Sequence, residues 1–274
     1  MKLGLNGATT MRADLATDAR VAAAAGFDLL EIWAAKLDEY LKAHTLADAK
    51  KLLERHRLQP LAINSVENIN YGADSNQVKA RTKQLCEYAQ ALGCPYVIIV
   101  PGPRPKGASD ATVKADTVKV LKALAALAQP TGVKLAFEMI GEVGRSVSKL
   151  GQALDIVREA QLSNVGLVLD CFHFYAGGSP LADIARLKPD ELYVLHLDDC
   201  ENLPKEQLTD AHRLFPGLGV IPLQDILGGL KQIGFTKLAS VELFRPEYWG
   251  WDPMKTAQEA YRRAKQAVEA AGWH

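Results

Sequence analysis

The sequence predicts an α/β fold in the form of a single (β/α)8 barrel, the TIM-barrel architecture, that takes up residues 1–274 as one domain. Eight short apolar runs alternate with amphipathic segments, and no break in composition divides the chain. The runs are nearly continuous in apolar residues, which is typical of parallel strands covered on both faces. Undivided α/β barrels commonly reach this length. These three observations favour one barrel over two smaller domains.

Each expected element has its own sequence signal. Strands are expected where aliphatic and β-branched residues run together, at 2–7, 28–33, 60–65, 96–102, 134–140, 165–171, 192–199 and 238–244. Helices are expected where apolar residues recur with the helical period, at 14–25, 46–57, 76–92, 111–129, 148–160, 222–233 and 254–271. Three of these helices run into "AAAG", "QALG" and "KQIG", where glycine suits the residue that ends a helix.

The alternative architecture is a doubly wound sheet of the Rossmann type. Such a sheet predicts a glycine-rich, phosphate-binding turn directly after its first strand. The first expected strand is followed by "NGATTMRAD", which contains no GxGxxG pattern. The sequence therefore favours the barrel.

Charge and composition narrow the class of partner. Lysine plus arginine and aspartate plus glutamate both number 32, so the formal net charge is zero, whereas nucleic-acid binders usually carry a basic excess. No apolar stretch reaches the roughly 18–20 residues that span a bilayer, and the N-terminus has no apolar signal segment. Cys86, Cys94, Cys171 and Cys200 form no CxxC spacing and are expected to be reduced thiols. We expect a cytoplasmic protein with a small-molecule substrate and neither a membrane nor a nucleic-acid partner.

Four late strands each end in a side chain that can bind a metal. These are Glu138 in "LAFEMI", Asp170 in "LVLDCFH", His196 in "YVLHLDD" and Glu242 in "SVELF". Since the C-terminal ends of barrel strands build the active site, the four groups are expected at one mouth. Buried carboxylates are costly unless a cation compensates them, which favours a shared divalent ion. Three carboxylates and one imidazole suit one Mn²⁺ first, with Mg²⁺, Co²⁺ and Zn²⁺ also compatible.

Each of these residues also has a purely structural interpretation. Glu138 could pair with a lysine or an arginine, and Asp170 could cap the turn that follows it. His196 could be a core histidine with both nitrogens satisfied, and Glu242 could pair with Arg245. The equivalent positions of the four on consecutive barrel strands favour the shared metal.

Two further groups lie beyond the expected ligands. His173 follows Asp170 by three residues, where a loop is expected. The segment "DAHRLFPGLG" contains His212 and Arg213 before a Pro-Gly turn, which could carry Arg213 over the mouth. The guanidinium group suits hydroxyl-rich or anionic ligands because its donors form a fixed fork. A solvated loop arginine is the alternative.

The earlier strands offer a wall for the same mouth. Trp33 ends its strand, and Glu67 and Asn68 follow theirs, so these side chains could line a substrate cup. Ordinary packing and loop solvation remain open for them. Cys171, next to Asp170, is expected on the opposite side of its strand and therefore in the core.

Several segments resemble the xylose-isomerase-like barrel superfamily of sugar isomerases and epimerases, which also contains DNA-repair enzymes of the endonuclease IV type. They are "GLVLDCFHFYAGGS", "HLDDCENLP", "LTDAHRLFPGLG", "LKQIGF" and "SVELFRPEYW". Within this superfamily the chain is similar to the inosose isomerase (2-keto-myo-inositol isomerase) family of inositol catabolism. The likeness covers essentially the whole chain and is densest from Glu138 onward.

The resemblance implies specific roles. It implies one divalent metal with four ligands, which are Glu138, Asp170, His196 and Glu242. It also implies that Glu138 and Glu242 form the acid–base pair, and that His173 and Arg213 contact the substrate. In the DNA-repair branch, histidines after strands 3 and 4 serve a three-metal cluster, but "AINSVENINY" and "VIIVPGPRP" contain none. The Asp-x-His pair at 210–212 leaves a second metal position open.

The function expected on these grounds is the metal-dependent isomerisation of a polyhydroxy ketone, an inosose, through an enediolate and a carboxylate pair. Alternatives on the same ligands are a ketose 3-epimerase and a metal-dependent dehydratase of the 3-dehydroshikimate type. An abasic-site endonuclease and a non-catalytic sugar-binding barrel are further alternatives. Whether protons move on one face or both stays open. A homo-oligomer is also open, since the aromatic segment at 244–251 suits either a substrate wall or a subunit contact.

Overall fold

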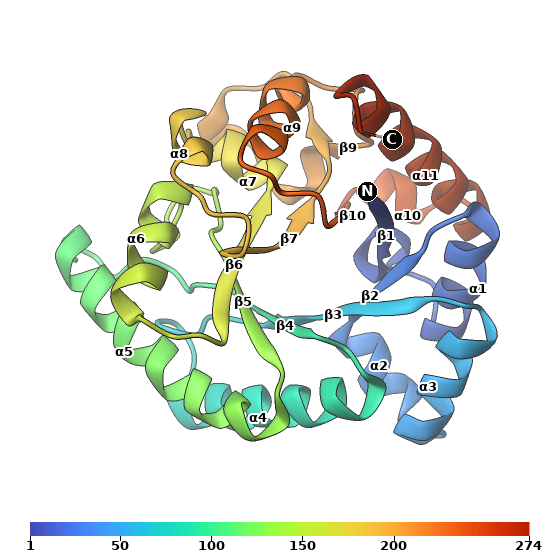
Figure 1. Cartoon of the computed structure of the whole chain (residues 1–274), viewed down its shortest axis with the longest axis horizontal. Helices are drawn as coiled ribbons and strands as arrows, with labels where there is room; N and C mark the ends of the chain where they lie inside the picture. Colours follow the sequence, from blue (N-terminus) through green and yellow to red (C-terminus); the bar gives the residue numbers. More distant parts are fainter. Residues whose placement is uncertain (274) are drawn as a thin grey trace.

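The computed structural model describes residues 1–273, in which eight parallel strands close into a barrel inside a ring of helices (Figure 1). Around the barrel the strands follow the order β1-β10-β7-β6-β5-β4-β3-β2. Their bounds are β1 (Lys2–Asn6), β2 (Leu29–Trp33), β3 (Gln59–Val66), β4 (Tyr96–Ile99), β5 (Lys134–Glu138), β6 (Val165–Asp170), β7 (Leu192–His196) and β10 (Leu238–Val241). The predicted (β/α)8 barrel is confirmed.

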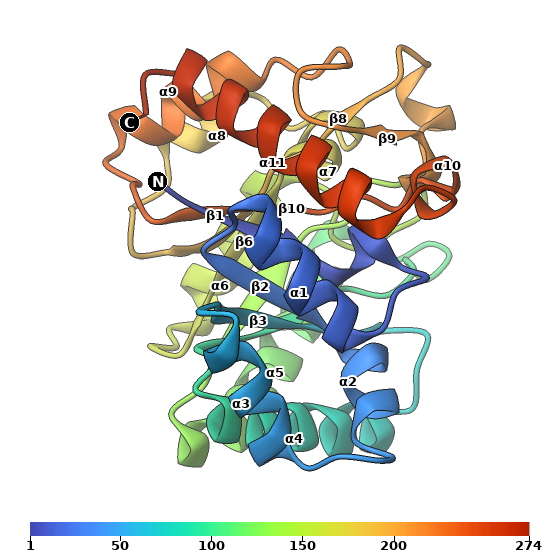
Figure 2. The same ribbon diagram turned by 90° about the vertical axis from the view of Figure 1, so that its right-hand side faces the viewer.

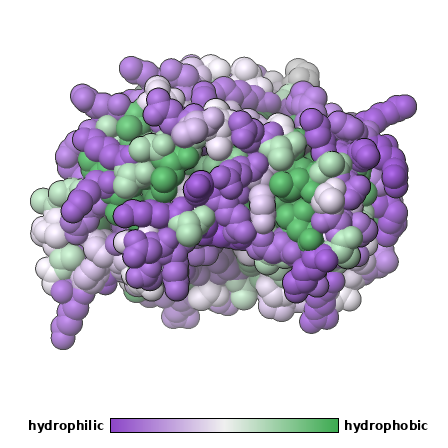
Figure 3. Space-filling model, turned by 90° about the horizontal axis from the view of Figure 1, so that it is seen from below, coloured by the Kyte–Doolittle hydropathy of each residue, from purple (hydrophilic) through white to green (hydrophobic). Residues whose placement is uncertain are grey.

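The outer helices match the predicted amphipathic segments within a few residues. They are α1 (Leu15–Ala25), α3 (Leu46–Arg55), α4 (Ser75–Leu92), α5 (Asp110–Ala128), α6 (Leu150–Ala160), α9 (Leu223–Gln232) and α11 (Pro253–Ala270). Gly26 and Gly93 end α1 and α4 with positive φ angles of 106° and 73°, as the sequence predicts. Hydrophilic side chains dominate the outer face in Figure 3, with smaller apolar areas between them. Within residues 1–273 we find no helix long and apolar enough to cross a membrane.

Several short elements were not predicted. They are α2 (Ala34–Tyr40), α7 (Cys171–Ala176), α8 (Ala182–Ala185), α10 (Pro246–Trp249), the antiparallel pair β8 (Asp199–Cys200) and β9 (Arg213–Leu214), and the 3-10 turns η1 (Gly7–Thr10), η2 (Gln129–Thr131), η3 (Lys205–Gln207) and η4 (Asp210–His212). The prediction of a loop at His173 is wrong, because this residue lies on α7. Seven of the eight predicted strands were longer than the observed ones, by three residues at 96–102, 192–199 and 238–244, so Glu242 lies just beyond β10.

Apolar side chains fill the barrel below its C-terminal mouth. One cluster packs between strands and helices, and a smaller one lies inside the barrel, formed by Leu29, Leu61, Ala62, Ile98, Val100, Ala136, Ile140, Val168, Tyr193 and Val194. Near the starts of β4 and β7, the rings of Tyr96 and Tyr193 stack with centroids 4.9 Å apart. The interior is therefore a packed core, as in other barrels of this class, and a cluster of buried polar groups lies at the mouth.

The first and last helices seal the ring. Helix α11 runs alongside α1 (Figure 2), and Phe27 meets Tyr261 edge-on with ring centroids 5.2 Å apart. Parallel pairing of β1 with β10, in which Lys2 lies opposite Leu238, closes the sheet at the same place. Segments from the two ends of the sequence thus form one continuous wall.

A buried ion pair holds the turn that follows β1. Lys36 Nζ lies 2.7 Å from Asp18 Oδ2, and the side chains are only 8% and 1% exposed. The same ammonium donates to the carbonyls of Gly7 and Thr10, at 2.8 and 2.9 Å. Thr10 Oγ1 donates to Asp18 Oδ1 at 2.7 Å. Each charge therefore depends on the other for its compensation.

We expect Lys36→Met to lower the free energy of unfolding by about 3–5 kcal/mol, because it leaves the Asp18 carboxylate buried without its cation. Lys42→Met is the matched control, since its pair with Glu39 is 70% exposed on both sides and is worth about 1 kcal/mol or less. Chemical denaturation of both variants measures the difference. Equal losses in the free energy of unfolding would show that the buried pair stabilises the fold no more than the exposed pair does.

Candidate metal centre

Four side chains converge at the C-terminal mouth of the barrel. Glu138, Asp170 and His196 are the last residues of β5, β6 and β7, and Glu242 is the first residue after β10. Asp170 pairs in register with His196, which itself lies opposite Ser240, so the strands end at one level. Each of the four offers one ligand atom, and these atoms lie within 4.8 Å of one another. The structure thus brings together the residues that the strand-end pattern singled out.

The imidazole of His196 lies in the middle of this group. Its Nδ1 is 3.0 Å from Glu138 Oε1, 3.1 Å from Glu242 Oε2 and 3.6 Å from Asp170 Oδ2. Its Nε2 is 3.1 Å from both carboxylate oxygens of Glu31. One ring nitrogen therefore faces the cluster, and the other faces a carboxylate across the barrel.

Burial and mutual repulsion set the proton affinities of the cluster. Burial raises the pKa of Glu138 to about 8, although His196 pulls it down. Burial alone would lower the pKa of His196, but the carboxylates of Glu242, Glu31 and Glu138 outweigh it and raise that pKa well above its ordinary value. Such a concentration of negative charge needs a positive group at its centre.

The donor set fits a divalent cation. Three carboxylate oxygens and one imidazole nitrogen form a mixed oxygen and nitrogen site of the kind that Mn²⁺, Mg²⁺, Co²⁺ or Zn²⁺ accepts. No thiolate takes part: Cys171, next to Asp170, is fully buried and packs in the outer core, as predicted. The site is therefore not selective for a soft metal.

The carboxylate of Glu242 is held by residues that the sequence did not single out. Its Oε1 accepts from Asn6 Nδ2 at 2.8 Å and from Asn64 Nδ2 at 2.7 Å. The backbone on either side is held by Thr9, whose Oγ1 donates to the carbonyl of Val241 at 2.9 Å and accepts from the amide of Leu243 at 3.1 Å. Strand β1 and the turn after it thus position Glu242.

Glu31 is a further residue that sequence reasoning missed. It is fully buried in β2, within the run "LLEIW". A glutamate inside an apolar strand is the same signal that drew attention to Glu242, and it would have identified Glu31 as well. Asn64 Nδ2 lies 3.1 Å from Glu31 Oε1, so one amide contacts both glutamates.

Arg213 lies inside the protein, so the alternative of a solvated loop arginine is wrong. Its side chain is about 1% exposed, and its guanidinium lies between the rings of Phe172 and Phe244, at 4.8 and 5.3 Å from their centroids. Its Nε donates to Asp210 Oδ1 at 2.8 Å. Short strand β9 and the two rings fix this cation beside the cluster.

The guanidinium of Arg213 donates hydrogen bonds to the carboxylates at the mouth. Nη1 donates to Asp170 Oδ2 at 2.6 Å and to Asp198, and it lies 3.4 Å from Glu242 Oε2. Burial would raise the pKa of Asp170, but Arg213 and the nearby histidines hold it well below its usual range. Asp198 in turn accepts from the amide of Phe172 at 2.8 Å, which connects the start of α7 to the segment that follows β7.

His173 contacts this guanidinium through one of its two ring nitrogens. Asp170 does cap the following turn, since its Oδ1 accepts from the amide of His173 at 2.6 Å. Nη2 of Arg213 lies 3.1 Å from His173 Nε2, and arginine can only donate, so Nε2 accepts and Nδ1 carries the proton. Burial lowers the pKa of His173, which suits a neutral ring. Within residues 1–273 no group accepts from Nδ1.

Trp33 and Glu67 line one cavity next to the cluster. The cavity measures about 370 Å³, and Asn64, which contacts Glu242, is also part of its wall. Trp33 is held edge-on against Phe244 with ring centroids 5.5 Å apart. The structure therefore places both predicted wall residues together, beside the four-residue group.

The pair Asp210 and His212 is engaged elsewhere. Asp210 accepts from Arg213, and His212 Nδ1 lies 3.0 Å from the amide nitrogen of Thr209, which donates to it. In the part of the chain that the structure describes, the only group of three or more metal-competent side chains is the cluster at the mouth. We find no second metal position at 210–212.

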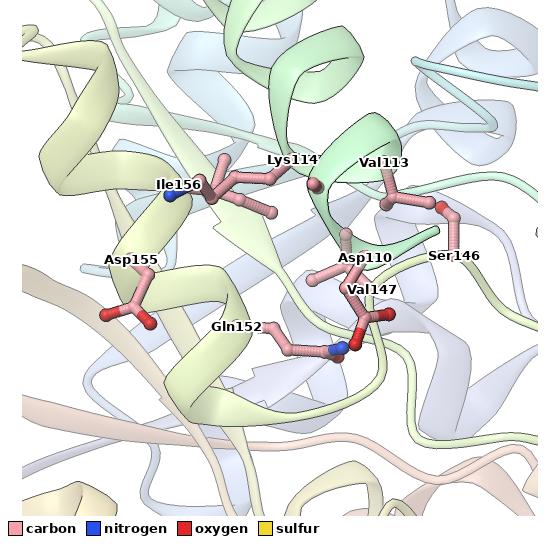
Figure 4. A pocket seen from close by; sticks show the side chains of 9 residues that line it. Asp110, Val113, Lys114, Ser146, Val147, Gln152, Asp155 and Ile156 are labelled. Carbon is pink, nitrogen blue, oxygen red and sulfur yellow. The ribbon is translucent and has the colours of Figure 1, made fainter. Parts of the chain in front are cut away.

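A second cavity lies apart from this chemistry, between α5 and α6. It measures about 330 Å³, and the side chain of Gln152 points across it toward Asp110 (Figure 4). Its charged residues are paired: Lys114 with Glu159, and Asp155 with Arg186, each at 2.5 Å. None of the residues at the barrel mouth lines it.

The aromatic segment at 244–251 packs on its own chain. Tyr248 is buried and stacks on Phe215 with centroids 4.2 Å apart. Trp249 Nε1 donates to the carbonyl of Ala8 at 2.8 Å, and Arg245 pairs with Glu201 at 2.6 Å. The segment therefore fixes the loops that surround Glu242.

Comparison with known proteins agrees with this architecture. A family model described as "Xylose isomerase-like TIM barrel" matches residues 19–271. The chain is 39% identical to an inosose isomerase of Halalkalibacterium halodurans, over 100% of this chain and 98% of that protein. It is 38% identical to an inosose isomerase of Bacillus subtilis, over 98% and 96% of the two chains. A crystal structure of the IOLI protein with a bound zinc atom superposes with a TM-score of 0.95 and 36% identity, covering 99% of both chains.

Proposed function

Since this chain belongs to the xylose isomerase-like TIM barrel family, we propose that it is a divalent-metal-dependent isomerase that acts on an inosose. The observation that carries the proposal is the buried group of three carboxylates and one imidazole, with ligand atoms within 4.8 Å of one another at the barrel mouth. Full-length similarity to inosose isomerases supplies the substrate class, a ketone on a polyhydroxylated ring.

We propose Glu138, Asp170, His196 and Glu242 as the residues that hold the metal. A divalent ion bound there would supply Lewis acidity, polarising the ketone and the neighbouring hydroxyl. Zn²⁺, present in the similar crystal structure, and Mn²⁺, expected from the sequence, both suit this donor set. Arg213 stabilises the negative charge of Asp170 and so keeps that carboxylate ready as a ligand.

Glu138 and Glu242 are the proposed acid–base pair. Isomerisation moves a proton from the carbon that bears the hydroxyl to the former carbonyl carbon, and the hydroxyl proton passes to the former carbonyl oxygen. Both amide donors at Glu242 contact Oε1, so Oε2, which lies 3.1 Å from His196 Nδ1, is the oxygen that faces the cluster. Glu138 comes from β5, and Glu242 from the end of β10, so the two carboxylates reach the ring from different sides of the mouth.

His173 and Arg213 are proposed to bind substrate oxygens. The unpartnered Nδ1–H of His173 is a buried donor that an oxygen of the ring would satisfy. Arg213 has five N–H donors, and its contacts with Asp210, Asp170, Asp198 and His173 occupy four of them. Arg213 therefore mainly orients the neighbouring carboxylates. One of its N–H groups remains to donate to a substrate oxygen. Trp33 and Glu67 are proposed as the wall of the cup.

Deuterium incorporation tests the function. The purified protein with Zn²⁺ or Mn²⁺ is incubated in D₂O with 2-keto-myo-inositol, and separately with a ketohexose and with 3-dehydroshikimate. We expect exchange at the carbon next to the ketone, together with formation of the isomeric inosose, only with the first compound. Exchange or turnover confined to a ketohexose or to dehydroshikimate would reject the inosose assignment and would identify an epimerase or a dehydratase.

We expect His173→Ala to lower kcat/KM by roughly 10²-fold, because it removes a preorganised donor to an oxygen that gains negative charge during proton removal. Steady-state kinetics with the inosose measure the effect. His212→Ala is the control and should stay close to the parent, because His212 is half-buried and its Nδ1 accepts from the amide of Thr209 rather than facing the cluster. Unchanged kinetics in His173→Ala would remove His173 from the substrate site.

A further inference from the structure

We propose that Glu31 is a positioning residue for the metal centre: it accepts the Nε2–H of His196 and leaves Nδ1 as the nitrogen that binds the metal. The inference rests on the proposed metal site and adds a residue from β2 to it. Both carboxylate oxygens of Glu31 lie 3.1 Å from His196 Nε2. Glu31 is separated from the four-residue cluster by the imidazole ring, so it acts through His196.

The burial of Glu31 requires a partner. Its side chain is 0% exposed, and a carboxylate without a compensating group is costly at such a position. In the described part of the chain its ion-pair partner is His196, and the amide of Asn64 is its further hydrogen-bond donor at 3.1 Å. An apolar residue in β2 would pack at no such cost, so the glutamate is explained by what it does to the imidazole.

The contact fixes both the orientation and the proton of the ring. With Nε2 directed to Glu31, Nδ1 lies 3.0 to 3.6 Å from the oxygens of Glu138, Glu242 and Asp170. A carboxylate can only accept, so the hydrogen on Nε2 stays there and the Nδ1 lone pair is available to a cation. A carboxylate behind a ligating histidine also increases the basicity of the ring.

Asn64 connects this support to the proposed base. Its Nδ2 contacts Glu31 Oε1 at 3.1 Å and Glu242 Oε1 at 2.7 Å. Glu31, Asn64, Glu242 and His196 thus form a closed ring of contacts, in which β2 and β3 orient groups at the ends of β7 and β10. A change at Glu31 should therefore alter the metal centre before it alters the fold.

The test is a metal titration that needs no turnover. Apo-protein prepared with a chelator is titrated with Zn²⁺ and with Co²⁺, by calorimetry and by the visible absorption of the Co²⁺ form. We expect Glu31→Leu to weaken affinity about 10- to 100-fold and to change the Co²⁺ spectrum. Glu31→Gln keeps an acceptor but loses the charge, and we expect about a 10-fold loss with a spectrum closer to the parent.

An exposed glutamate provides the matched control for these variants. Glu54→Gln removes the same charge from an exposed position on α3 and should bind both ions like the parent. Parent-like affinity and an unchanged Co²⁺ spectrum in a folded Glu31→Leu, or in Glu31→Gln if the leucine variant does not fold, would overturn the proposal. Failure of the inosose assay would reject the proposed function alone, whereas absence of stoichiometric metal binding by the parent would remove the site on which both depend.

Discussion

Glu242→Gln is expected to lower kcat for inosose isomerisation by about 10³- to 10⁴-fold while the barrel stays folded. The glutamine oxygen can still accept from Asn6 and Asn64, which lie 2.8 and 2.7 Å from Oε1 in the parent, so the shape of the site is kept. The atom that replaces Oε2 becomes an amide nitrogen, which cannot take a proton from carbon. Steady-state kinetics and solvent deuterium exchange measure the loss, and circular dichroism checks the fold.

Glu247→Gln is the matched control for this variant. Glu247 lies five residues further on, is 57% exposed and pairs only with Arg245 at 3.0 Å among its described ion pairs. The same change of charge should there leave kcat within about twofold of the parent, as for other surface substitutions. Near-parent turnover in Glu242→Gln would exclude Glu242 as an acid–base group, whatever its role toward the metal.

Removal of the metal is the second large effect. Dialysis against a strong chelator is expected to abolish activity to below about 1% and to lower thermal stability, because a ligand at 100 times its Kd contributes about 2.7 kcal/mol to the folded state. Zn²⁺, Mn²⁺, Co²⁺ and Mg²⁺ are then added back separately, and the ion that restores activity at the lowest concentration identifies the cofactor. Full activity in metal-free protein would contradict the proposed centre.

Asp170→Asn and Asp210→Asn form a pair for the same experiment. Asp170 lies in the cluster, whereas Asp210 contacts Arg213 outside it. We expect the first variant to need much more added metal than the parent, and the second to respond to chelation and readdition as the parent does. An equal effect of both changes would point to Arg213, which they share, rather than to the metal.

Sequence was sufficient for the barrel because parallel strands covered on both faces leave a strong apolar pattern. It was also sufficient for the convergence of Glu138, Asp170, His196 and Glu242, because strand ends in a barrel meet at one mouth. Each of these residues stands out as a polar group in an apolar run. The local sequence pattern and the barrel topology therefore both predicted the same four residues at the mouth.

The features that could not be predicted from the sequence depend on contacts between elements that are distant in the chain. Glu31 in β2 meets His196 in β7 across the interior, although β2 pairs with β1 and β3 and β7 pairs with β6 and β10. Nothing near Glu31 in sequence indicates that partner. Helix α7 and the β8–β9 pair were missed because they are short and are stabilised by tertiary contacts, such as the capping of α7 by Asp170, rather than by their own periodicity.

The support of Glu242 by β1 also constrains how this protein can mature during synthesis. Asn6 and Thr9 are translated first, and the backbone that they hold around Glu242 is translated more than two hundred residues later. A nascent chain that has not yet released β10 from the ribosome lacks Glu242, one of the two proposed acid–base groups, however many of its earlier βα units have formed. Catalytic competence therefore arises only when the barrel closes, and the appearance of activity during translation would time that closure.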